Sequence, residues 1–164
     1  MNTAADLAQR ILTLDSLAFF FILMFTSIFF VKVFTSRFQI SKFQFLLLAA
    51  SINVIFALTL RWWEWRGTPP TFWLVDENSW NAVLDLNSNW IFNVLLFIPA
   101  GYFLSKYLNK LPAVFLFLTL LSLSIETLQG MFEWGSSDPA DWVANTCGAS
   151  FGVLLAKFQQ KRIF

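Results

Sequence analysis

Five runs of apolar residues, each long enough to cross a lipid bilayer, constrain the fold of this chain more than any other feature. A helix that crosses a hydrocarbon core about 30 Å thick needs roughly 17–25 mostly apolar residues. Unpaired backbone groups are costly in lipid, so runs of this length favour helices. We therefore predict an all-α membrane protein built as a five-transmembrane-helix bundle. The predicted spans are residues 17–33, 43–60, 90–108, 111–129 and 139–157.

The composition agrees with this fold class and excludes several functions. Of 164 residues, 57% are hydrophobic and 13% are charged, which is not typical of a soluble domain. We treat residues 1–164 as one membrane domain. The net charge of +1 gives no reason to expect a nucleic-acid partner. Histidine is absent and Cys147 is the only cysteine, which excludes imidazole bases, His ligands and an intrachain disulfide. The sequence identifies no cofactor and no metal site.

Two segments outside the spans have interfacial character. Residues 1–15 place three apolar side chains on one helical stripe, which predicts either a short interfacial helix or a disordered lead-in. Residues 61–89 form a Trp-rich loop broken by Gly67 and Pro69-Pro70, and such Trp density favours the headgroup level of a bilayer. We predict that this outer loop anchors the protein at the membrane surface. The first span follows no basic segment, so it does not resemble a cleavable signal.

The charges predict the orientation of the bundle. When five spans are drawn, most basic residues fall on one side, which the positive-inside rule assigns to the cytoplasm. These residues are Lys32, Arg37, Lys42, Lys106, Lys110, Lys157, Lys161 and Arg162. Every Asp, Glu and Trp falls on the other side or in the outer part of a span. We therefore predict a multi-pass protein of the inner (plasma) membrane with the N-terminus outside and the C-terminus in the cytoplasm.

Polar residues interrupt the last three spans at similar depth. Glu126 lies roughly 20 Å along a helix that starts near Pro112, within the outer third of the hydrocarbon core. Acids and amides inside apolar helices are costly and usually face each other or a water-filled cavity. We predict one pocket that opens outward. Its residues are Asn93, Glu126, Gln129, Asp138, Asp141 and Asn145.

Each of these residues also has a structural interpretation. Glu126 can join the fourth and fifth helices through hydrogen bonds to Gln129 and Asn145. Asp138 stands before a proline in the first turn of the fifth helix, where an N-cap is expected. Asn93 can satisfy backbone groups that a proline in its own span leaves free.

A second set of residues is predicted to serve helix packing. Pro99 should kink the third span and free a carbonyl one turn earlier. Gly101 lies two residues further on, and Gly148 and Gly152 form a GxxxG step that allows close approach of a neighbouring helix.

The order of these motifs resembles the VanZ-like family of small bacterial integral membrane proteins. The motifs are Asn93 with FIPAG at 97–101, SIETLQ at 124–129, Asp138, Asp141, NTCGA at 145–149 and Gly152. The resemblance covers about residues 90–156. It implies a helical membrane fold and, from a founding member linked to teicoplanin resistance, a role in the cell envelope.

The chain departs from the family at one position. The family pattern has an Arg about three residues before the first Asp of the last helix, whereas Gly135 and Ser136 stand there in this sequence. If that Arg binds an anionic group, the role is absent here unless Arg61 or Arg66 supplies it from the loop.

Three functional classes remain open. The first is a protein that binds or modifies an envelope amphiphile, such as a lipid-linked wall intermediate, a lipid headgroup or a glycopeptide antibiotic. The second is an enzyme in which Glu126 and Asp141 hold Mg²⁺ or Ca²⁺ or act as acid and base. The third is an accessory subunit of a larger membrane complex. Membrane lipids are expected partners in all three classes.

Overall fold

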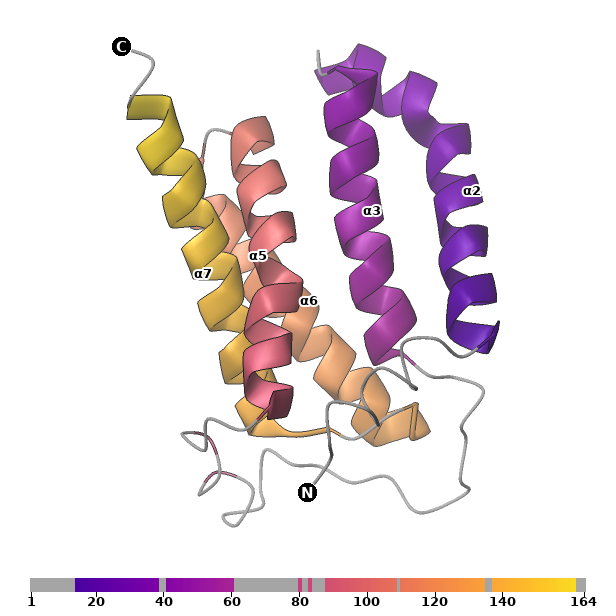
Figure 1. Cartoon of the computed structure of the whole chain (residues 1–164), viewed down its shortest axis with the longest axis vertical. Helices are drawn as coiled ribbons and strands as arrows, with labels where there is room; N and C mark the ends of the chain where they lie inside the picture. The colour runs from indigo at the N-terminus through magenta and orange to yellow at the C-terminus, as the bar shows by residue number, and fades with distance from the viewer. Residues whose placement is uncertain are drawn as a thin grey trace.

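The protein is an all-α structure. The computed structural model describes residues 14–38, 41–60, 80, 83, 88–108, 110–134 and 137–161, and the five long helices run along one another (Figure 1). Their bounds are α2 Leu14–Phe38, α3 Lys42–Thr59, α5 Ser88–Leu108, α6 Leu111–Phe132 and α7 Pro139–Lys161. Each predicted span coincides with one of these helices to within a few residues. The predicted interfacial segment 1–15 and the Trp-rich loop 61–89 lie almost entirely outside the described residues.

Within the described parts of the chain, three helices are long and apolar enough to cross a membrane. They are Lys42–Thr59 in α3, Ser88–Lys106 in α5 and Leu111–Phe132 in α6. Helix α2 contains a shorter apolar stretch, Leu17–Ile28. Helix α7 is less apolar because it carries polar side chains at both ends, such as Asp141 and Gln159.

Local signals fix where several helices begin and end. The Ser41 hydroxyl accepts a hydrogen bond from the Gln44 amide at 3.1 Å and caps α3. Helix α6 begins with a proline in its first turn, where the missing N–H costs nothing. It ends at Glu133, whose φ of 57° is left-handed.

Helices α5 and α7 pack backbone against backbone. A Cβ atom added to Gly148 would lie 2.1 Å from the Val94 carbonyl oxygen, and one added to Gly152 would lie 2.2 Å from that of Ile98. From the other helix, a Cβ on Gly101 would lie 2.3 Å from the Ala149 oxygen. Only glycine fits at such distances, so these three residues set the separation of the two helices.

The α2 and α3 pair is joined differently. The buried Asn53 amide donates to the Ser27 hydroxyl at 3.0 Å and lies 3.3 Å from the Met24 sulfur. Apolar side chains from α3, α5 and α6 fill the centre of the bundle, with Ile55 and Phe97 fully buried. Pro99 lies inside α5 but is exposed, and it lines an apolar hollow of about 440 Å³ between α3 and α5.

Candidate functional site

The end of α6 and the start of α7 are joined through Glu126. Its side chain is 2% exposed, and Oε2 accepts a hydrogen bond from the Asp138 backbone amide at 2.9 Å. The Ser137 hydroxyl donates to the Glu126 backbone carbonyl at 2.7 Å. These two hydrogen bonds join α6 to the segment that precedes α7 and fix the position of that segment.

Asp138 caps α7, as its position before a proline predicts. Its Oδ1 accepts from the Ala140 amide at 2.8 Å. Its backbone carbonyl accepts from Asp141 at 3.1 Å and from Trp142 at 3.3 Å. The residue therefore satisfies donors of the first helical turn while its own amide is bonded to Glu126.

Asn93 joins α5 to the start of α7. Its side chain, 9% exposed, hydrogen bonds with the Asp141 side chain in the first turn of α7. The Glu126 carboxyl interacts electrostatically with Asp141 and Asp138. We call Asn93, Glu126, Asp138 and Asp141 the carboxyl cluster. It gathers four of the six predicted pocket residues from three helices.

Asn145 lies one helical turn further along α7 and bonds to a residue that the sequence did not single out. Its amide donates to the Ser122 hydroxyl at 3.0 Å, and its side chain is 1% exposed. Its Oδ1 has no hydrogen-bond partner within the described part of the chain. Ser122 stands four residues before Glu126, so the same helix-face spacing that grouped the other polar residues would have found it.

Gln129 reaches another helix. Its amide donates to the Thr59 carbonyl at 2.7 Å, where α3 ends, whereas the sequence interpretation grouped it with Glu126 and Asn145. The last carbonyls of a helix lack intrahelical donors, and Gln129 supplies one. This residue therefore ties α6 to α3 and does not bond within the carboxyl cluster.

Trp142 is a further neighbour that the sequence analysis passed over. Its indole N–H donates to the Thr119 carbonyl of α6 at 3.3 Å. Its ring meets that of Trp80 edge to face, with centroids 6.5 Å apart. Trp80 belongs to the Trp-rich loop, so at least one residue of that loop contacts the start of α7.

The described residues hold no group of three or more His, Cys, Asp or Glu side chains arranged to bind a metal ion. Cys147 is exposed on α7. The family's Arg position, occupied here by Gly135 and Ser136, lies outside the described residues, as do Arg61 and Arg66.

The fold and the cluster define a class: an α-helical protein with helices that are long and apolar enough to span a membrane, and with acidic and amide side chains gathered between α5, α6 and α7. Within that class the chain belongs to the VanZ/LLP1 family, whose model matches residues 12–160. The predicted VanZ-like membership is confirmed.

One relative is Protein VanZ of Enterococcus faecium, which is 37% identical over 74 residues. The matched stretch covers 43% of this chain and 45% of that protein, so it spans less than half of the relative's length. No solved structure matches the chain significantly.

Proposed function

We propose that this chain is a multi-pass protein of the bacterial plasma membrane in which all five helices cross, with the N-terminus outside and the C-terminus in the cytoplasm. The gathering of lysines at the predicted cytoplasmic ends of the helices supports this topology. Lys42 begins α3, Lys106 lies in the last turn of α5, Lys110 precedes α6 and Lys157 is near the end of α7. These helix ends lie together at one end of the bundle (Figure 1).

Reporter fusions test the topology. A fusion after Lys110 should report the cytoplasm, and a fusion after Gly67 should report the outside. The opposite pattern would show that the bundle has the reverse orientation. If both fusions reported the same side of the membrane, the prediction of five spans would be wrong.

For the site, we propose that the carboxyl cluster binds the polar part of an envelope amphiphile: a lipid-linked wall intermediate, a lipid headgroup or a glycopeptide antibiotic. The observation that carries this proposal is the gathering of two further carboxyl groups, those of Asp138 and Asp141, beside the nearly buried Glu126 side chain. Carboxyl groups shielded from water lack the hydrogen bonds that water would supply, so a ligand that brings an amino group or several hydroxyl donors stabilises them.

Family membership also supports a role in the cell envelope, although it does not name a ligand. The matched relative is Protein VanZ, and the family resemblance links a founding member to teicoplanin resistance. A pocket for a polar amphiphile near the outer surface is consistent with such a role. An acid and base function of Glu126 and Asp141 stays a prediction.

Glu126→Gln tests the site. The substitution keeps the size of the side chain and an oxygen that can accept from the Asp138 amide, so we expect a stability cost of about 1 kcal/mol or less. It removes the group that would carry a negative charge toward the ligand's amino group, and hydrogen bonds to charged groups are worth about 1.5–3 kcal/mol, so ligand affinity should fall at least about tenfold. Binding of teicoplanin and of a lipid-linked wall precursor to the protein in nanodiscs measures this.

Glu133→Gln is the matched control, because it replaces an acid at the C-cap of α6, outside the four residues of the cluster. Its affinities should equal those of the wild type. Unchanged binding by both Glu126→Gln and Asp141→Asn would reject a charged site.

The alternative is a non-catalytic accessory subunit of a larger membrane complex with a degenerate VanZ-like site. Gly135 and Ser136 at the family's Arg position favour this alternative. Purification in mild detergent separates the two proposals. A foreign subunit recovered in stoichiometric amount, with no binding of either ligand, would favour the accessory role.

A further inference from the structure

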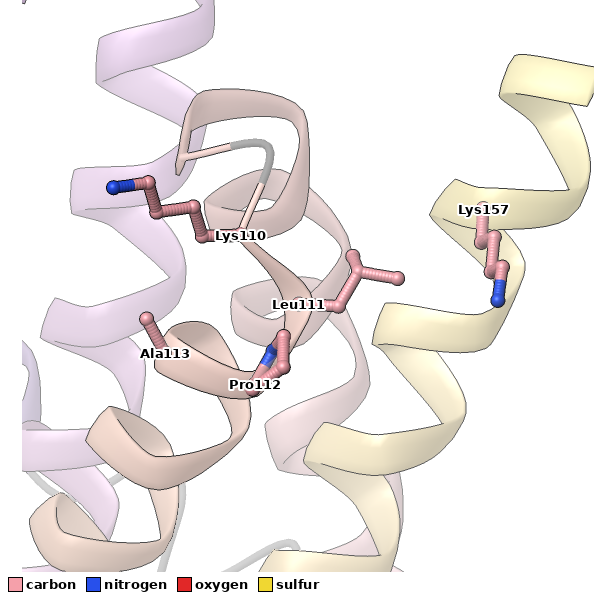
Figure 2. Close-up of a pocket in the computed structure, with 5 residues that line it drawn as sticks. All are labelled: Lys110, Leu111, Pro112, Ala113 and Lys157. Atoms are coloured by element: carbon pink, nitrogen blue, oxygen red, sulfur yellow. The ribbon is translucent and has the colours of Figure 1, made fainter.

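A hollow of about 670 Å³ lies between the start of α6 and the last part of α7, far from the carboxyl cluster. It is lined by Lys110, Leu111, Pro112 and Ala113 on one side and by Lys157 on the other (Figure 2). Ligand sites commonly measure about 300–1,000 Å³, so this hollow is large enough for a lipid headgroup and the upper part of its chains.

The lining combines an apolar floor with positive charge. Figure 2 shows the Leu111 side chain directed from α6 toward α7, and the Lys157 side chain running along α7 on the other side of the hollow. Lys110 extends from the start of α6 on the side away from α7. Its side chain is exposed and flexible, so its ammonium can turn toward an anion without displacing packed atoms.

The start of α6 adds to the positive potential. Helix N-termini carry a partial positive charge, and Lys110 in the N-cap position makes no side-chain capping bond. The Ala113 and Val114 amides bond to the Lys110 carbonyl at 3.0 and 3.1 Å. The flexible side chains of the two lysines therefore supply full positive charges, and the N-terminus of α6 adds a partial positive charge that is fixed in place.

No carboxylate of these helices neutralises the two lysines. The sequence has no Asp or Glu from residue 90 to 125 or from 142 to 164. The nearest acid along the chain is Glu126 for Lys110 and Asp141 for Lys157, each sixteen residues away. Sixteen helical residues span roughly 24 Å, well beyond the Debye length of about 8 Å at physiological salt. The basic charge of the hollow is thus available to an anion.

We propose that this hollow is a binding site for an anionic phospholipid, whose phosphate lies between Lys110 and Lys157 and whose chains lie on Leu111, Pro112 and Ala113. Helix α6 is apolar enough to span a membrane from Leu111 onward, which puts the hollow at the level of the headgroups. Basic pockets between membrane helices bind anionic headgroups in this way. The site does not depend on the function of the carboxyl cluster or on the orientation of the bundle.

Lipid retention tests the proposal. The full-length protein is reconstituted in nanodiscs of equal parts phosphatidylglycerol and phosphatidylcholine, extracted in mild detergent, and analysed for bound lipid by mass spectrometry. The wild type should retain phosphatidylglycerol preferentially. Lys110→Gln with Lys157→Gln should reduce that preference by roughly fivefold for each lysine removed.

Two pairs of control substitutions test whether the position of the charge, and not only its amount, decides lipid retention. Lys42→Gln with Lys106→Gln removes the same charge from the same end of the bundle but outside the hollow, and should leave the preference unchanged. Lys110→Arg with Lys157→Arg keeps the charge and should preserve it. The substituted side chains at 110 and 157 are exposed, and helix content by circular dichroism monitors folding.

Three results would overturn the proposal. The Gln pair at 110 and 157 could retain the wild-type preference. The control pair at 42 and 106 could reduce it as much, which would indicate general attraction of a basic surface. Soluble glycerol phosphate at millimolar concentration could displace the lipid, which would indicate a site for a free anion.

Discussion

Helix α7 meets its two neighbours in different ways. Toward α5, Gly148 and Gly152 bring the two backbones into direct contact, with no side chain between them. Side-chain bonds such as that of Asn93 with Asp141 add to this contact. Toward α6, no such glycine contact is found among the described residues, and hydrogen bonds join Asp138 to Glu126 and Asn145 to Ser122. A backbone contact cannot adjust without separating the helices, whereas polar side chains can exchange partners. The glycine contacts with α5 therefore fix the position of α7, and the interface with α6 is the one that can rearrange.

The largest expected effect is at the α5 interface. In Gly148→Ala the new Cβ would lie 2.1 Å from the Val94 carbonyl oxygen, so the helices must move apart. We expect a loss of about 3 kcal/mol in unfolding free energy, the upper end for overpacked cores. Thermal unfolding in detergent measures this.

Cys147→Leu serves as the control for that substitution, since the neighbouring residue is exposed and can take added bulk. Its melting temperature should stay near that of the wild type. Equal stability of Gly148→Ala and the wild type would contradict the backbone contact.

A smaller loss of stability is expected from substitutions at the N-cap of α7. Asp138→Ala removes the acceptor for the Ala140 amide, and loss of such a cap typically costs about 1 kcal/mol. Asp138→Ser keeps a capping oxygen and removes the carboxylate, so it should cost less. Equal losses from Ala and Ser in denaturant titrations would show that the charge, not the cap, stabilises this end of α7.

The smallest effect is expected for the buried pair Asn145 and Ser122. A double-mutant cycle with Asn145→Ala and Ser122→Ala should give a coupling energy of about 0.6 kcal/mol, the mean for polar contacts between membrane helices. Unfolding free energies of the wild type, both single variants and the double variant yield this value. Coupling above about 2 kcal/mol would contradict the view that this interface is readily rearranged.

The sequence by itself determined the five helices, and it placed their ends to within five residues. Apolar runs of sufficient length form helices because backbone groups must be bonded within the segment when water is excluded. Capping is equally local, and Asp138 could be assigned because Pro139 follows it. The GxxxG spacing at 148 and 152 also predicted a close helix contact.

Only the tertiary structure decided which polar residues share a site. Gln129 lies three residues from Glu126 in sequence, yet it bonds to the Thr59 carbonyl, 70 residues earlier in the chain. Asn93 bonds to Asp141, and Ser122, which the sequence analysis omitted, pairs with Asn145. Spacing along a helix shows which residues share a face, but the neighbour of that face depends on how helices pack. That packing is set by close contacts such as those of Gly101, Gly148 and Gly152, between segments far apart in the chain.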